Sequence, residues 1–212
     1  LYESRWHTEG GNFQRTYYLP NGRIPGPLAP ERSALLRGRR FAQSAPTFAD
    51  GMLYLSIGGT LNALSLEDHS ARWKLTTNKE YGILSQPTVD GDLAIFGSND
   101  HEIRAVNTRT GEVAWSYPTE FRITGSPCVV GDKVVVGSGD GIVYAFERKT
   151  GDLRWQFKAG QSIYSSVATD GRNIFFSSFN YQVYSLDENG KQRWSFKTGG
   201  PIRSGVSVGA DQ

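Results

Sequence analysis

The sequence predicts an all-β fold built from repeated four-stranded units, because three markers recur in phase about every 40 residues. One marker is a tryptophan, with spacings of 42, 40 and 39 residues, and the others are an Asp/Gly turn dipeptide and a short segment ahead of it. The tryptophans are Trp73, Trp115, Trp155 and Trp194, the dipeptides are Asp50-Gly51, Asp90-Gly91, Gly131-Asp132 and Asp170-Gly171, and the segments span 44–46, 85–87, 125–127 and 165–167. The 25 glycines, 10 tyrosines and 11 phenylalanines also suit short strands joined by tight turns.

The second repeat illustrates how one period divides into strands. We expect strands over 86–89, 93–97, 102–106 and 112–117, separated by turns at 90–92 and 98–101 and by the hairpin at Thr110-Gly111. Asp-Gly between apolar runs favours a hairpin, because such turns need positive φ at their central residues. Four antiparallel strands per ~40 residues is the period of a β-propeller blade.

The same division predicts four complete blades, over 45–76, 86–117, 126–157 and 165–196, and the opening of a fifth from residue 202. We therefore expect residues 44–212 to be propeller repeats and residues 1–43 to be an N-terminal arm, a candidate for closing the ring. An unclosed propeller leaves apolar blade faces in water. Ring completion is expected from missing sequence or from a second chain.

Two segments, 105–115 and 145–155, share a small residue, a Thr-Gly hairpin and a tryptophan four residues after the glycine. This pattern resembles the tryptophan-docking motif of the quinoprotein (PQQ) propellers, and residues 6–16 are similar to the opening pattern of that family. The resemblance implies that the indole packs between neighbouring blades, in a ring of roughly seven or eight blades. The first repeat departs from the motif, with His69 in place of the glycine, and the fourth has Asn189-Gly190 before its tryptophan.

The resemblance also raises one enzyme class, the quinoprotein dehydrogenases, which use PQQ and Ca²⁺ and carry an adjacent pair of cysteines near the cofactor. The sole cysteine, Cys128, lies in an apolar strand pattern, where a small buried hydrophobe is the expected role. We therefore expect no catalytic residue, no cofactor and no metal in this chain.

Other chemistry has little support in the sequence. His7, His69 and His101 are not at metal-binding spacing, and both Asp68-His69-Ser70 and the segment 99–102 are interpreted as polar turns. A formal charge of +2 does not favour nucleic acid, and no apolar stretch approaches the ~20 residues that span a bilayer.

Propeller topology instead predicts a binding face, because the loops between blades and the loops between the second and third strands emerge on one side. Tyrosine and arginine are frequent in interaction hot spots. The candidate partner-binding residues are Tyr81, Asn99, Asp100, Arg122, Tyr164, Phe179, Asn180, Tyr181 and Arg203.

The function that we predict is a noncatalytic scaffold or adaptor that binds a protein partner through these loops. In this the chain resembles the propeller lipoprotein of the bacterial outer-membrane assembly machinery and related extracytoplasmic binding domains. The resemblance implies a periplasmic or otherwise extracytoplasmic, bacterial location within a larger envelope assembly. Two alternatives stay open: a fragment of a PQQ-dependent dehydrogenase, and a sensor domain of a signalling protein.

Overall fold

The computed structural model describes residues 44–77 and 82–208, and these residues form sixteen strands and no helix. The first blade comprises β1 (Thr47–Ala49), β2 (Met52–Ile57), β3 (Thr60–Ser65) and β4 (Ala71–Thr76). The second comprises β5 (Thr88–Asp90), β6 (Leu93–Gly97), β7 (Glu102–Asn107) and β8 (Val113–Pro118). The third comprises β9 (Cys128–Val130), β10 (Lys133–Gly137), β11 (Ile142–Glu147) and β12 (Leu153–Lys158). The fourth comprises β13 (Ala168–Thr169), β14 (Asn173–Ser178), β15 (Gln182–Asp187) and β16 (Gln192–Lys197).

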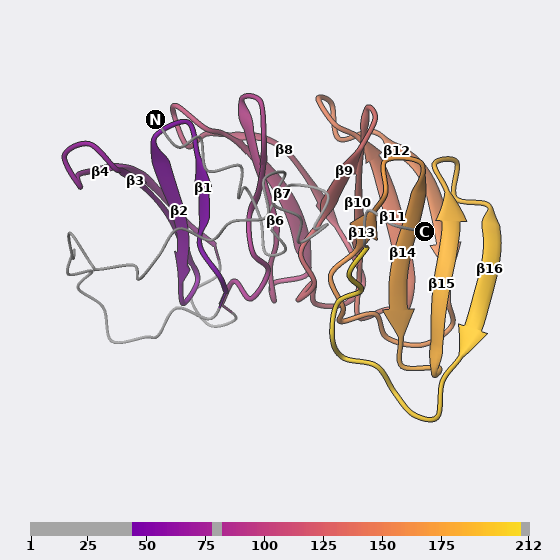
Figure 1. Ribbon diagram of the computed structural model, residues 1–212. Coiled ribbons are helices and arrows are strands. Elements are labelled where there is room, and N and C mark those ends of the chain that lie inside the picture. Colours follow the sequence, from indigo (N-terminus) through magenta and orange to yellow (C-terminus); the bar gives the residue numbers. More distant parts are fainter. Residues whose placement is uncertain (1–43, 78–81, 209–212) are drawn as a thin grey trace, which may run out of the picture.

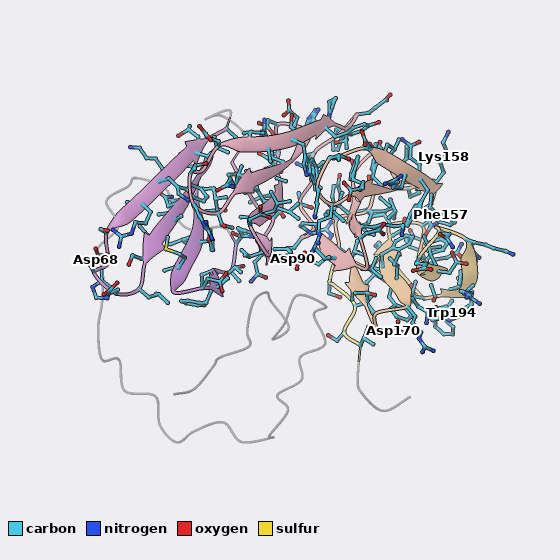
Figure 2. The ribbon with its side chains drawn as sticks, turned by 90° about the horizontal axis from the view of Figure 1, so that it is seen from above. Asp68, Asp90, Phe157, Lys158, Asp170 and Trp194 are labelled. Atoms are coloured by element: carbon cyan, nitrogen blue, oxygen red, sulfur yellow. The ribbon has the colours of Figure 1, made fainter. Side chains whose placement is uncertain are left out.

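Each blade is a four-stranded antiparallel sheet in sequence order, which confirms the predicted all-β propeller repeats. The blades stand side by side, from the first in indigo to the last in yellow (Figure 1). Seen from above they follow an arc, with the first and last blades at opposite ends (Figure 2). The N-terminal arm at 1–43 and Tyr81 lie outside the described residues, as does the end of the fifth repeat from residue 209.

The first hairpin of each blade lies at the predicted turn, but the turn geometry differs between blades. In the first blade Asp50 and Gly51 both have positive φ, of 49° and 72°, as the Asp-Gly signal predicts. In the second and third blades the register moves the two-residue loop to 91–92 and 131–132, and only Gly91 and Gly131 have positive φ. A glycine at the first central position is typical of a type II′ turn, which suits the same strand twist.

The outer edge of every blade repeats one irregularity in the pairing of its third and fourth strands. A register shift follows the small residue that faces the tryptophan, as at Ala105, which is paired with Trp115. Equivalent shifts follow Ala63, Ala145 and Ser185. A bulge bends the strand locally and increases its twist, and the small residue leaves space beside the indole. These pairings explain the small residue in the sequence motif.

The hydrophobic core is divided into three clusters, one between each pair of adjacent blades. The cluster between the second and third blades includes Ile95, Trp115, Val134 and Phe146. The other two clusters fill the remaining joints in the same way. Cys128 lies in the third of these joints and is fully buried, as its strand pattern predicts. Packing between blades is therefore the main source of burial.

Tryptophan docking, which the family resemblance implies, is present at all three joints. The Trp115 indole is 7% exposed, and its Nε1 donates a hydrogen bond of 2.8 Å to the carbonyl oxygen of Arg148 on the next blade. Gly151, in that same hairpin, has a φ of 76° and lies directly against the indole.

The inner strands are joined by polar contacts at the same period. Thr88 is fully buried, and its hydroxyl donates to the carbonyl of Pro127, 39 residues later, at 2.7 Å. The hydroxyl of Ser126 accepts a hydrogen bond from the backbone N–H of Gln86, and the hydroxyl of Ser166 accepts one from the backbone N–H of Ser126. Buried hydroxyls and backbone groups thereby satisfy one another along the row of blades.

Candidate partner-binding face

The predicted loop face is held together by hydrogen bonds between the two kinds of loop. The N–H of Ile123, in a connection between blades, donates to the carbonyl of Ser98 in a neighbouring turn, at 3.1 Å. In the next two blades the N–H of Gly139 donates to the carbonyl of Arg122 and that of Phe179 to the carbonyl of Ser162, both at 3.0 Å. The two sets of loops therefore share one face, as the topology predicts.

A continuous run of aromatic rings and guanidinium groups crosses this face. The Arg122 guanidinium lies 5.5 Å from the centre of the Phe121 ring and 5.2 Å from that of Tyr164. Tyr164 meets Phe179 edge to face at 5.1 Å, and Arg203 lies 5.5 Å from the centre of the Phe179 ring. These separations are within the range of cation–π attraction and aromatic pairing. We call Phe121, Arg122, Tyr164, Phe179 and Arg203 the cation–aromatic row.

Neither Arg122 nor Arg203 forms an ion pair with a carboxylate of the described residues. Burial acts to raise the pKa of the Tyr164 phenol, but hydrogen bonds with Ser162 and Arg122 and the charge of Arg122 outweigh it, so the pKa is lowered. The row therefore combines positive charge with apolar ring surface.

Four of the predicted residues lie on this face but outside the row. The Asp100 carboxylate is held by both terminal nitrogens of Arg104, at 2.9 and 2.8 Å, and its charge is thereby offset. The Asn180 amide donates to the carbonyl of Ala159 at 2.8 Å, which fixes the turn. Asn99 donates its N–H to the carbonyl of Gly82. Tyr181 has a φ of 67° and stays 45% exposed beside the row.

The sequence analysis did not include Phe121 among the candidate residues, and it assigned His101 only to a polar turn. The Phe121 ring is 40% exposed and stacks against the His101 imidazole at 5.6 Å. The available signal was the position of Phe121 beside Arg122 in a connection between blades. His101 was interpreted as part of a turn, and it does lie in one, with a φ of 71°.

The remaining polar motifs of the described residues lie in turns. In the hairpin between β3 and β4 the Asp68 carboxylate accepts hydrogen bonds from the N–H and hydroxyl of Ser70. These bonds lower the pKa of Asp68 to about 2. Over residues 44–77 and 82–208 there is no cluster of three His, Cys, Asp or Glu side chains placed to hold a metal ion. The same ranges contain no helix with the length and hydropathy needed to cross a bilayer.

A family model described as outer membrane protein assembly factor BamB matches residues 29–165 and 139–211 of the chain. The chain belongs to the BamB family. This result agrees with the docked tryptophans and with the quinoprotein-like repeats that the sequence predicts. The comparison with curated proteins gave no match.

Solved structures with the same fold include BamB from Moraxella catarrhalis, at 20% identity and a TM-score of 0.67, over 76% of this chain and 52% of that one. A europium-containing methanol dehydrogenase has 17% identity and a TM-score of 0.72, over 92% of this chain and 49% of the other. The quinohemoprotein alcohol dehydrogenase ADHIIG from Pseudomonas putida HK5 has 18% identity and a TM-score of 0.73, over 92% and 40%. This BamB family chain thus spans about half or less of each structure. At these identities the likeness establishes the fold alone.

Proposed function

We propose that this chain is a noncatalytic adaptor that binds a protein partner through the cation–aromatic row, as part of a larger envelope-associated assembly outside the cytoplasm. The observation that carries the proposal is a pair of arginines stacked on aromatic rings and not engaged by carboxylates of the described residues. The description of the matching family as an outer membrane protein assembly factor supports both the adaptor role and the location.

The chemistry of the row indicates the kind of surface that it would bind. Guanidinium groups held over rings offer directed hydrogen bonds to carboxylates, and the rings beside them offer apolar contact area. Binding would cost little side-chain entropy here, because the stacked side chains of Arg122 and Tyr164 already restrict each other in the free chain. We expect a partner segment in which acidic side chains alternate with apolar ones.

Site-directed photocrosslinking tests this proposal. A photoreactive phenylalanine analogue at Phe121, which is 40% exposed, is compared with the same analogue at Leu153 on β12, which is also 40% exposed. In an envelope fraction of the source cells, we expect Phe121 to give a discrete adduct with one protein and Leu153 to give none. Arg122→Ala combined with Arg203→Ala should reduce the Phe121 adduct at least about tenfold, which corresponds to ~1.4 kcal/mol of binding free energy. Equal labelling from both positions, or an adduct that is insensitive to the arginine changes, would contradict the proposal.

The second candidate function is a piece of a PQQ-dependent dehydrogenase. It is favoured by the two dehydrogenase structures, each of which aligns with 92% of this chain. Equilibrium dialysis of the chain against PQQ and Ca²⁺, followed by visible absorption spectroscopy, separates the two functions. Retention of one quinone per chain would favour the dehydrogenase, whereas the adaptor predicts no retention above a protein control.

A further inference from the structure

The three joints between blades are built in the same way: each has an indole donor on one blade and, on the next blade, an outer hairpin that receives it. We call the place of the glycine in that hairpin the receptor position. At each joint the indole Nε1 of one blade donates to a backbone carbonyl in the outer hairpin of the next. The pairs are Trp73 to Thr108 at 2.8 Å, Trp115 to Arg148 at 2.8 Å and Trp155 to Glu188 at 3.0 Å. Each receiving hairpin also carries a glycine with positive φ: Gly111, Gly151 and Gly190.

The glycine is required by space as well as by backbone conformation. A Cβ added at Gly111 would lie 2.6 Å from the Trp73 ring, and one at Gly151 or Gly190 would lie equally close to its own tryptophan. Such a distance is well inside van der Waals contact, and the nearest atoms belong to a ring fixed by its hydrogen bond. A hairpin with a side chain at this position therefore cannot receive the indole in the observed geometry.

The two ends of the row of blades are not equivalent. At the β16 end, Trp194 is 47% exposed and Phe196 is 65% exposed, and Trp194 lines a hollow of about 700 Å³. Val206 and Val208, beyond the last strand, already line this hollow. Asp68 and Trp194 mark the opposite ends in Figure 2.

At the other end, the receptor position of the first blade is occupied by His69, with a φ of 59°. The hairpin around it keeps one backbone bond of the glycine hairpins, the bond to the first turn of its own blade. The N–H of Leu66 donates to the carbonyl of Gly51 at 2.8 Å, as the N–H of Thr108 donates to that of Asp92 at 2.9 Å in the second blade. The difference that bears on docking is the side chain of His69, because its Cβ stands where an indole would lie.

We propose that His69 prevents the first blade from receiving a docked tryptophan. The Trp194 indole then docks on a blade with a glycine hairpin and not on the first blade of a second copy of this chain. The occupant that we propose for the hollow is a propeller blade with glycine at the receptor position, packed on the surface that residues 206–208 already line. A blade that packs on the other side of the first blade would then do so without a docked indole.

Self-association of the purified chain tests the proposal, with His69→Gly and His69→Asn as a matched pair. Asparagine tolerates positive φ but keeps a Cβ, so His69→Asn relieves the same backbone without opening the space. We expect the native chain and His69→Asn to show no association that depends on Trp194. His69→Gly should strengthen self-association at least about tenfold in sedimentation equilibrium, with reduced acrylamide quenching of Trp194.

Adding Trp194→Ala to His69→Gly should abolish the gain, which assigns it to the indole. His69→Gly and His69→Asn should keep the thermal midpoint of the native chain or exceed it, because glycine and asparagine suit this backbone better than histidine. Association of the native chain that Trp194→Ala abolishes would overturn the proposal. So would a gain of the same size with His69→Asn, or no gain with His69→Gly.

Discussion

The receptor glycine of a blade joint can be tested by replacing Gly151 with alanine. The backbone there has a φ of 76°, and an added Cβ would lie 2.6 Å from the Trp115 ring. Gly131 is the matched control, because its φ is also positive, at 58°, and nothing lies within 4 Å of an added Cβ. Comparing the two alanine variants therefore separates backbone strain from displacement of the indole.

The expected magnitudes follow from the contacts. Alanine in the left-handed region costs about 1–2 kcal/mol at either site. At Gly151 the indole must also move, which weakens its hydrogen bond to Arg148, worth about 1 kcal/mol, and its ring contact with Phe146 at 5.8 Å, worth about 0.5–1.5 kcal/mol. We expect a loss of unfolding free energy of about 1–2 kcal/mol for Gly131→Ala and about 2.5–4.5 kcal/mol for Gly151→Ala.

Urea unfolding followed by far-ultraviolet circular dichroism measures both losses without relying on the perturbed indole. If Gly151→Ala costs no more than Gly131→Ala, the joint tolerates a side chain at the receptor position. The steric argument for tryptophan docking, and with it the role assigned to His69, would then be refuted.

Three further predictions follow from burial and hydrogen bonding. Trp194→Ala should cost less than about 1 kcal/mol and Trp115→Ala about 3–5 kcal/mol, because only the second indole is docked; equal losses in urea unfolding would contradict this. Burial raises the pKa of Tyr54 to about 12 from its ordinary value of 10, so the unfolded chain loses this proton at a lower pH than the folded chain. The contribution of the neutral Tyr54 phenol to stability is therefore complete below pH 10 and is lost as the pH rises through about 12. Tyr54→Phe should accordingly lose less stability than the native chain between pH 8 and pH 11.5, and parallel losses would refute the assignment. Thr88→Val removes a buried hydrogen bond between blades and should cost about 1–2 kcal/mol by thermal unfolding, whereas an unchanged midpoint would show that the bond contributes nothing.

The blades could be predicted from the sequence because their signals are local. A turn glycine, a small residue and a tryptophan four residues after the hairpin glycine can all be recognised within one repeat of the sequence, and their phase gives the strand boundaries to within a few residues. Turn type was less predictable, since the register places the loop at 91–92 rather than at Asp90-Gly91.

The cation–aromatic row was only partly predictable, because it depends on contacts between repeats. Arg122 and Tyr164 are 42 residues apart, and their stacking depends on the packing geometry of neighbouring blades. Asp100 and Asn180 look like exposed loop residues in the sequence, yet nearby donors and acceptors hold their side chains. The histidine in place of the hairpin glycine at position 69 is visible in the sequence. That it blocks docking could be inferred only from where the indoles lie at the other joints.

Because burial is divided among separate clusters, each belonging to one pair of neighbours, the described repeats form a nearly one-dimensional system. Stability in such a system is approximately a sum of unit terms and nearest-neighbour couplings. Within the described residues the fourth blade has one coupling where the second and third have two, so in the isolated chain amide hydrogens of β14 and β15 should exchange faster than those of β10 and β11. The same locality means that duplicating or deleting a unit of ~40 residues leaves the chemistry of the other joints unchanged, a route by which ring size can drift during evolution without redesign of the blades.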